Sequence, residues 1–210
     1  MNIAVIGASA GIGMEIIKRA VAREHTVTTL SRSKLLLVNS KSVHSIQGNA
    51  LNKYLLKKSI EKADAVMVTL GTDKNIKSTT LFSDFAKVVV DLQREIKTKV
   101  PFIFVTGFGT GDSQEYATWF LKMFLKYTLK DVYLDKAKME EIIRCSDLNW
   151  IFVRPGRLLD EPVTEKYRTE STLFSGINIG GINRSDVADF MVKQAENPSE
   201  MKKFVGITAK

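Results

Sequence analysis

The stretch Gly7-Ala8-Ser9-Ala10-Gly11-Ile12-Gly13 decides the fold, because it joins a strand-length apolar run to a helical pattern. The run Ile3 to Ile6 precedes it, and apolar residues recur at helical spacing from Gly11 to Arg23. Glycine permits a sharp turn and a close approach of backbone to phosphate, and a helix N-terminus offers free N–H groups to an anion. The order strand, glycine turn, helix therefore predicts a dinucleotide-binding unit. The alternative is a tight turn with close helix packing and no ligand.

Composition narrows the class of protein. The chain has 210 residues, of which 44% are hydrophobic and 26% charged, so it can bury a core and is not intrinsically disordered. One cysteine and two histidines exclude an internal disulfide and argue against a metal centre. The net charge of +8 suits an acidic or phosphorylated partner. Because the lysines are scattered and no nucleic-acid-binding motif is present, we do not expect nucleic acid to be that partner.

Apolar runs of strand length alternate with segments of helical period along the whole chain. Most of these runs are continuously apolar, which is typical of parallel strands covered by helices on both faces. The expected strands are Ile3–Ile6, Thr26–Leu30, Val43–Gln47, Ala65–Leu70, Phe102–Thr106, Trp150–Val153 and Phe204–Ile207. The expected helices are Gly11–Arg23, Leu51–Glu61, Thr80–Lys97, Asp135–Cys145 and Ser185–Glu196. The pattern predicts an α/β fold: a Rossmann-type, doubly wound parallel sheet of about seven strands in a single domain over residues 1–210.

One long irregular stretch, Leu158 to Asn183, follows the carboxyl end of an expected strand and is rich in Gly, Thr and Ser. Ligands of open α/β folds bind outside the carboxyl ends of the strands. We therefore expect residues 158–183 to form a loop on the substrate side.

The end of the second expected strand indicates which dinucleotide is bound. An NAD site usually places a carboxylate there to accept from the adenosine ribose, whereas this chain has Ser31, Arg32, Ser33 and Lys34. A guanidinium matches a phosphate monoester in charge and geometry, so Arg32 favours NADPH over NADH. The alternative is an ordinary exposed basic turn.

Further motifs extend this pattern over nearly the whole chain. They are Leu70-Gly71-Thr72, Phe104-Val105-Thr106-Gly107, Asp135-Lys136-Ala137-Lys138-Met139-Glu140-Glu141, Trp150-Ile151-Phe152-Val153-Arg154-Pro155-Gly156-Arg157-Leu158 and Asn183-Arg184-Ser185-Asp186-Val187-Ala188. Together with the glycine turn they resemble the atypical short-chain dehydrogenases/reductases, which include NmrA-like NAD(P)-binding proteins and biliverdin-IXβ/flavin reductases. The resemblance implies the fold and the cofactor more specifically than the substrate.

Carried over residue by residue, the resemblance implies a complete cofactor site. Asn49, where relatives usually have Asp, and Ala50 would lie beside the adenine. Lys136 would hydrogen-bond the nicotinamide ribose. The full expected set is Gly7, Ser9, Ala10, Gly11, Ile12, Gly13, Ser31, Arg32, Asn49, Ala50, Leu70, Gly71, Thr72, Thr106, Lys136, Pro155 and Gly156, with Thr106 near the nicotinamide and Pro155 and Gly156 at its carboxamide end.

The expected catalytic residues are Thr106, Tyr133 and Lys136. Typical members of the family use Tyr-x3-Lys, in which the lysine lowers the tyrosine pKa. Here Val132 stands four residues before Lys136, and Tyr133 only three. Residues three apart share a helical face, so a Tyr133–Lys136 partnership is one hypothesis. Two further residues each have two alternative roles. Arg154 is either a structural charge or a ligand contact, and Asp186 is either a helix-capping partner or a catalytic acid.

The segment from Tyr116 to Lys130 carries five aromatic or Met side chains at helical spacing and three lysines on another face. We expect a core helix with a solvated lysine side. A lid over the substrate pocket, a subunit interface and binding to a membrane surface are the alternatives.

Without a secure tyrosine acid, the chemistry best supported is NADPH-dependent hydride transfer to a small-molecule acceptor such as a flavin or quinone. The alternative is a dinucleotide sensor that regulates a partner protein without turnover. The N-terminus resembles no signal peptide and no segment is apolar enough to span a membrane, so we expect a cytoplasmic protein, either a monomer or a homodimer.

Overall fold

The structure is a computed structural model that describes residues 1–33, 35, 41–72 and 79–210. Its central sheet has eight strands in the order β3-β2-β1-β4-β5-β6-β10-β8. Seven of them run parallel, and β8 pairs antiparallel with β10. The strands are β1 (Asn2–Ile6), β2 (Thr26–Ser31), β3 (Val43–Gln47), β4 (Ala65–Val68), β5 (Pro101–Val105), β6 (Asn149–Pro155), β8 (Tyr167–Glu170) and β10 (Phe204–Ala209).

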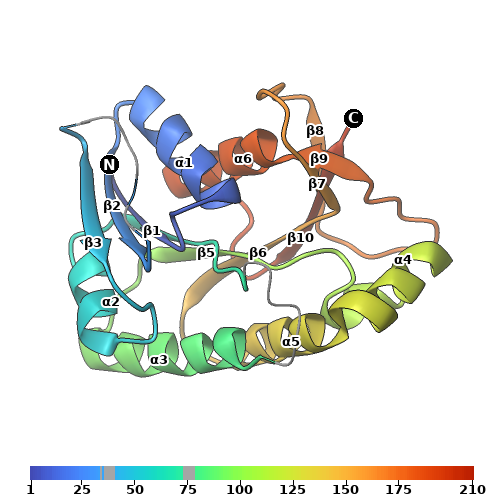
Figure 1. The fold of residues 1–210 in the computed structure, drawn as a ribbon, viewed down its shortest axis with the longest axis horizontal. Helices are drawn as coiled ribbons and strands as arrows, with labels where there is room; N and C mark the ends of the chain where they lie inside the picture. Colours follow the sequence, from blue (N-terminus) through green and yellow to red (C-terminus); the bar gives the residue numbers. More distant parts are fainter. Residues whose placement is uncertain (34, 36–40, 73–78) are drawn as a thin grey trace.

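Helices cover both faces of this sheet (Figure 1). One face carries α1 (Gly11–Ala22) and α6 (Arg184–Glu196), and the other carries α2 (Lys53–Ile60), α3 (Leu81–Ile96) and α5 (Lys130–Arg144). Each face has its own buried apolar cluster, because the parallel strands project apolar side chains to both sides. The predicted doubly wound α/β fold is confirmed, with one antiparallel strand beyond the expected seven.

The strand order reverses between β1 and β4, since β2 and β3 lie on one side of β1 whereas β5 and β6 lie beyond β4. Crossovers from β1 and β4 therefore leave in opposite directions and open a crevice at the carboxyl ends of these strands. The glycine turn follows β1, so the topology places it at the mouth of this crevice.

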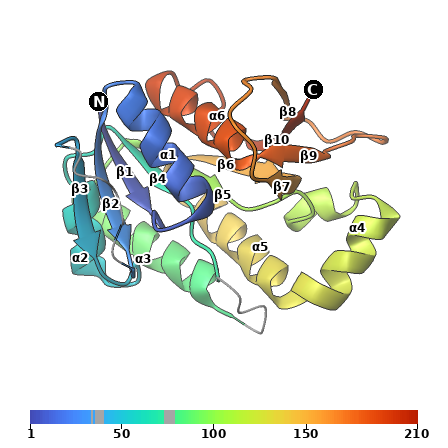
Figure 2. The same ribbon diagram turned by 45° about the horizontal axis from the view of Figure 1, so that its top comes forward.

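The stretch from Leu158 to Asn183 is more ordered than expected. It includes β8 and most of a small parallel pair, β7 (Arg157–Leu159) with β9 (Gly181–Asn183). The expectation of an irregular loop throughout is wrong, because β8 finds hydrogen-bond partners along the free edge of β10. Figure 2 shows β7 and β9 beside the end of α6.

A 3₁₀ turn, η1 (Gly111–Gln114), precedes the aromatic segment. The segment itself forms α4 (Trp119–Phe124) and a π-helical stretch, η2 (Leu125–Leu129), that runs into α5. The expectation of a core helix is wrong, since Trp119 and Phe120 are 74% and 75% exposed. Figure 1 shows the reason: α4 lies past the end of the central sheet, so no strand of that sheet covers it. In the described part of the chain, no helix combines the length and the apolar character needed to cross a bilayer.

Asp186, in the first turn of α6, anchors the segment before β8. Its Oδ1 accepts hydrogen bonds from the backbone N–H groups of Thr164 (2.7 Å) and Glu165 (2.8 Å). Its Oδ2 accepts from the Thr164 hydroxyl (2.9 Å) and from Asn183 Nδ2 (3.0 Å). The carboxylate is 1% exposed and uses both oxygens within the fold, which favours a structural role over that of a catalytic acid, although its backbone partners lie in the 164–165 segment and not in α6.

We expect Asp186→Ala to lower the free energy of unfolding by about 3 kcal/mol, because it removes a buried carboxylate that accepts four hydrogen bonds. Asp186→Asn is the matched control, since its amide oxygen can still accept from the two backbone N–H groups and the loss should be smaller. Urea unfolding of the three proteins measures both values. A loss below about 1 kcal/mol for Asp186→Ala would contradict the anchoring role.

Candidate functional site

A cavity of about 420 Å³ occupies the crevice at the β1/β4 switch point. Its walls come from the glycine turn and the start of α1, the ends of β2, β3, β4 and β5, the first turn of α3, one side of α5, and one residue each of β7 and α6. The residues that line it are Gly7, Ser9, Ala10, Gly11, Ile12, Leu30, Ser31, Arg32, Gly48, Asn49, Ala50, Thr69, Leu70, Gly71, Thr72, Leu81, Phe82, Val105, Thr106, Val132, Lys136, Leu158 and Arg184.

The glycine turn is packed against the end of β4. Gly7 has φ +90°, and a Cβ there would lie 2.7 Å from the Thr69 carbonyl oxygen. A Cβ at Gly13 would lie 2.6 Å from the Gly7 carbonyl oxygen, which accepts a hydrogen bond from Thr69 Oγ1 at 3.1 Å. No L side chain fits either place without displacing backbone. Gly13 therefore acts from outside the cavity, by letting α1 approach β4.

The N-terminus of α1 opens into the cavity with its N–H groups uncapped. The N-cap residue Ala10 makes no side-chain hydrogen bond, and the first turn contains no acidic residue. By contrast, the start of α3 is capped by Asp135 of α5, whose Oδ2 accepts from Phe82 N at 2.8 Å. Unpaired N–H groups and the positive end of the helix dipole make the start of α1 a place for an anion.

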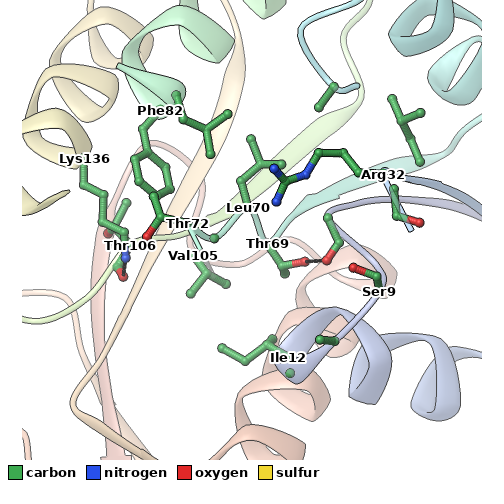
Figure 3. Close-up of a pocket in the computed structure, with 18 of the residues that line it drawn as sticks. Ser9, Ile12, Arg32, Thr69, Leu70, Thr72, Phe82, Val105, Thr106 and Lys136 are labelled. Carbon is green, nitrogen blue, oxygen red and sulfur yellow. Dashed lines mark hydrogen bonds between the residues drawn. The ribbon is translucent and has the colours of Figure 1, made fainter. Parts of the chain in front are cut away.

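Arg32 and Lys136 lie at opposite ends of the cavity, with Phe82, Val105 and Leu70 between them, and Ser9 lies below Arg32 (Figure 3). Arg32 directly follows β2. Gln47 Nε2 donates to its carbonyl oxygen (3.1 Å), and the Ser31 hydroxyl donates to the Ser33 carbonyl oxygen (2.8 Å), so the turn that carries Arg32 is tied to β3. Lys34, which the sequence placed beside Arg32, lies outside the described residues.

Lys136 projects from α5 towards the end of β5. Its Nζ donates to the Thr106 carbonyl oxygen at 2.7 Å and lies 5.3 Å from the centre of the Phe82 ring. Burial lowers the pKa of Lys136 to about 8, and the nearby charge of Glu140 opposes this shift. The ammonium group is therefore held in place by a carbonyl and an aromatic face while it loses part of its hydration.

A buried ion pair of Glu140 and Arg154 holds the Thr106 side chain in place. Both oxygens of Glu140 accept hydrogen bonds from Arg154, one from Nε at 3.0 Å and the other from Nη2 at 2.8 Å. Glu140 is 3% exposed and Arg154 is 2% exposed. The Thr106 hydroxyl donates to Glu140 Oε1 at 2.7 Å. Since a hydroxyl has one proton, Thr106 offers lone pairs, not a proton, to a ligand in the cavity. Arg154 does not line the cavity, which favours its structural interpretation.

Tyr133 lies outside this cavity. Its ring is 5.4 Å from Lys136 Nζ, and its hydroxyl lies against Gly107, where a Cβ would be 2.7 Å away. It lines a second cavity together with Gly109 and Leu125. Burial raises the pKa of Tyr133, which is opposite to the shift that a tyrosine acid-base group needs. Val132, four residues before Lys136, lines the crevice cavity instead.

Most of the expected cofactor residues line one cavity. The exceptions are Gly13, Pro155 and Gly156; a Cβ at Gly156 would collide with the Gly180 carbonyl oxygen, so this residue packs against the 179–180 segment. Sequence reasoning missed Phe82 and Arg184 as wall residues, and it missed Glu140 as the acceptor for Thr106. Leu158 lies in the stretch that was expected on the substrate side. Arg184 had one signal, since it belongs to the Asn183–Ala188 motif and directly precedes Ser185, where the sequence placed the start of a helix. Across the described residues, no three His, Cys, Asp or Glu side chains gather as metal ligands.

A family model described as NAD(P)H-binding matches residues 7–198, which include the glycine turn, both ends of the cavity and α6. The chain belongs to this NAD(P)H-binding family. The resemblance to NAD(P)-binding reductases inferred from the sequence is thus confirmed for the family and for the cofactor class.

Relatives of this NAD(P)H-binding protein carry names of oxidoreductases. Oxidoreductase claK of Passalora fulva is 26% identical over 176 residues, 74% of this chain. The chain spans 65% of the length of the curated relatives that it matches.

Among solved structures, a short-chain dehydrogenase/reductase from Veillonella parvula in complex with NADP has a TM-score of 0.81 at 16% identity, covering 99% of this chain and 94% of that one. A candidate NADH-flavin reductase from Streptococcus pneumoniae has a TM-score of 0.80 at 24% identity, covering 100% of both. At these identities, the two structures show a shared fold.

We expect stability to respond to the titration of Lys136. Between about pH 8 and its ordinary value of 10.5, the folded protein has lost this proton and the unfolded chain still binds it, so rising pH favours the folded state. In wild type, this group should add about 3 kcal/mol to the unfolding free energy across that interval. Urea unfolding at several pH values should show that Lys136→Met removes the increment. Lys138→Met, an exposed lysine on the same helix, should retain it. Identical pH profiles for wild type and Lys136→Met would contradict the lowered pKa.

Proposed function

We propose that the protein is an NADPH-dependent oxidoreductase that transfers hydride to a flavin, a quinone or a related conjugated acceptor. One observation carries the proposal: a single cavity joins Arg32, the uncapped start of α1, and the Lys136–Thr106 pair in that order. This matches the order of the 2′-phosphate, the diphosphate and the nicotinamide ribose along an extended dinucleotide.

The residues present fit such a ligand. The glycine turn and the N–H groups of α1 would hold the diphosphate, because no side chain or acidic group occupies that position. Asn49 and Ala50, at the end of β3, would contact the adenine. The Lys136 ammonium would donate to the hydroxyls of the nicotinamide ribose while remaining bonded to the Thr106 carbonyl oxygen.

The bound nicotinamide would supply the hydride. Thr106 would accept a hydrogen bond from an N–H group, such as that of the carboxamide, since its own proton is committed to Glu140. Val132, Phe82 and Leu158 would exclude water beside the reacting atoms. With no tyrosine hydroxyl in the described wall of the cavity, an acceptor that requires little proton donation from the protein suits the site best. The likeness to a candidate flavin reductase supports the same class of acceptor.

A dinucleotide sensor is the second candidate, and the position of Val132 favours it. Val132 faces the cavity at the place of the family's catalytic tyrosine and can exchange no proton. Such a protein would bind the cofactor with the same residues and change a partner protein without turnover.

Arg32 should determine the preference for NADPH. We expect Arg32→Gln to weaken NADPH binding by about tenfold to a hundredfold, because a charged hydrogen bond to the 2′-phosphate is lost. NADH binding should change by less than about twofold. Calorimetric titration of both cofactors measures the four dissociation constants, and Arg94→Gln on the outer surface of α3 controls for net charge. Equal affinity of the wild-type protein for NADH and NADPH would exclude Arg32 from this role.

Loss of NADPH absorbance with a panel of acceptors tests turnover. We expect oxidation of NADPH with FMN, riboflavin or a benzoquinone, and little with a simple ketone, because the cavity supplies alignment without a proton donor. Lys136→Met should reduce turnover by at least about tenfold, whereas Lys138→Met should leave it unchanged. Turnover confined to the ketone would refute the acceptor class. Tight NADPH binding without turnover on any acceptor would favour the sensor.

A further inference from the structure

Arg184 is the first residue of α6, yet its side chain lies against the first residue of α1. A Cβ built on Gly11 would be 3.7 Å from Arg184 Nε and 3.8 Å from its Cδ. The two helices pack side by side with their N-termini at the same edge of the sheet (Figures 1 and 2). Arg184 therefore contributes a guanidinium to the cavity wall beside the uncapped start of α1.

This arrangement concentrates positive charge. Each helix N-terminus carries the positive end of its dipole, and cations are disfavoured there. Two carboxylates lie near the guanidinium. Asp186, in the first turn of α6, uses both oxygens to accept hydrogen bonds from the 164–165 segment and Asn183. Asp160 pairs with Arg184 Nη1 at 2.7 Å, but its side chain is 83% exposed, so solvent screens this pair. The groups that line the cavity at this place, the start of α1 and the Arg184 guanidinium, are positive and suit an anion.

We propose that Arg184 binds the diphosphate of the dinucleotide, opposite the N–H groups of α1, and so acts as a second basic anchor that is independent of Arg32. The inference rests on the proposed function and adds a ligand contact to it. The guanidinium side chain is 28% exposed, close enough to solvent to reorient and buried enough for a phosphate contact to be strong. A diphosphate is common to NADH and NADPH, so Arg184 contributes to affinity for both, whereas Arg32 discriminates between them.

The test compares Arg184→Gln with Arg32→Gln on three ligands: NADPH, NADH and 2′-AMP, which carries the 2′-phosphate but no diphosphate. We expect Arg184→Gln to weaken NADPH and NADH binding equally, by about tenfold to a hundredfold, and to leave 2′-AMP binding unchanged. Arg32→Gln should give the opposite pattern, with losses for NADPH and 2′-AMP only. Arg184→Lys, which keeps the charge but not the planar fork, should fall between wild type and Arg184→Gln.

Arg157→Gln is the matched control, because it removes an exposed arginine from neighbouring β7 that does not line the cavity. Urea unfolding shows whether each variant is folded. Unchanged affinity of Arg184→Gln for both dinucleotides would overturn the inference. So would an equal loss for 2′-AMP, which would indicate a general change in the cavity. Failure of the wild-type protein to bind either dinucleotide would overturn the proposed function and this inference together, whereas wild-type binding with an unaffected Arg184→Gln overturns this inference alone.

Discussion

The close approach of the glycine turn to the end of β4 is the constraint on which the cavity depends. Backbone atoms of Gly7 and Thr69 occupy the space that a side chain at either Gly7 or Gly13 would need. This contact lies at the point where the strand order reverses, so it also sets the position of α1 relative to both halves of the sheet. The uncapped N–H groups of α1 point into the crevice for that reason, and the basic residues around them are arranged with respect to this one helix end.

The other end of the cavity is organised by the Glu140–Arg154 pair. The pair links α5 to β6, and the Thr106 hydroxyl adds β5 to the same network. Burying both charges is costly unless their hydrogen bonds are complete, which here requires the three elements to keep one relative position. Lys136 lies one helical turn before Glu140, so the same network fixes the ammonium group against the Thr106 carbonyl oxygen. The polar groups at this end are therefore aligned before any ligand binds.

The aromatic segment shows that helical spacing of apolar residues does not by itself predict their burial. Spacing alone identifies one apolar and one basic side from Tyr116 to Lys130, and most such helices lie on a core. Here α4 passes the end of the sheet, so Trp119, Phe120 and Tyr127 are exposed and Leu125 is buried. The sequence pattern is the same in either case. The difference lies in whether another layer happens to extend under the helix, which is a property of the whole fold.

The sequence by itself determined the doubly wound fold, the glycine turn, and the approximate places of Arg32, Thr106 and Lys136. These follow from local signals, namely strand and helix periods, glycine spacing and residues at strand ends, and topology carries them to one edge of the sheet. Tertiary structure decided which of two adjacent residues, Val132 or Tyr133, faces the cavity, because the rotation of α5 is set by packing on α3 and β6. It also decided the pairing of Arg154 with Glu140 and the contact of Arg184 with Gly11. Residues so far apart in the chain meet only through the packing of whole elements, and no local pattern encodes that meeting.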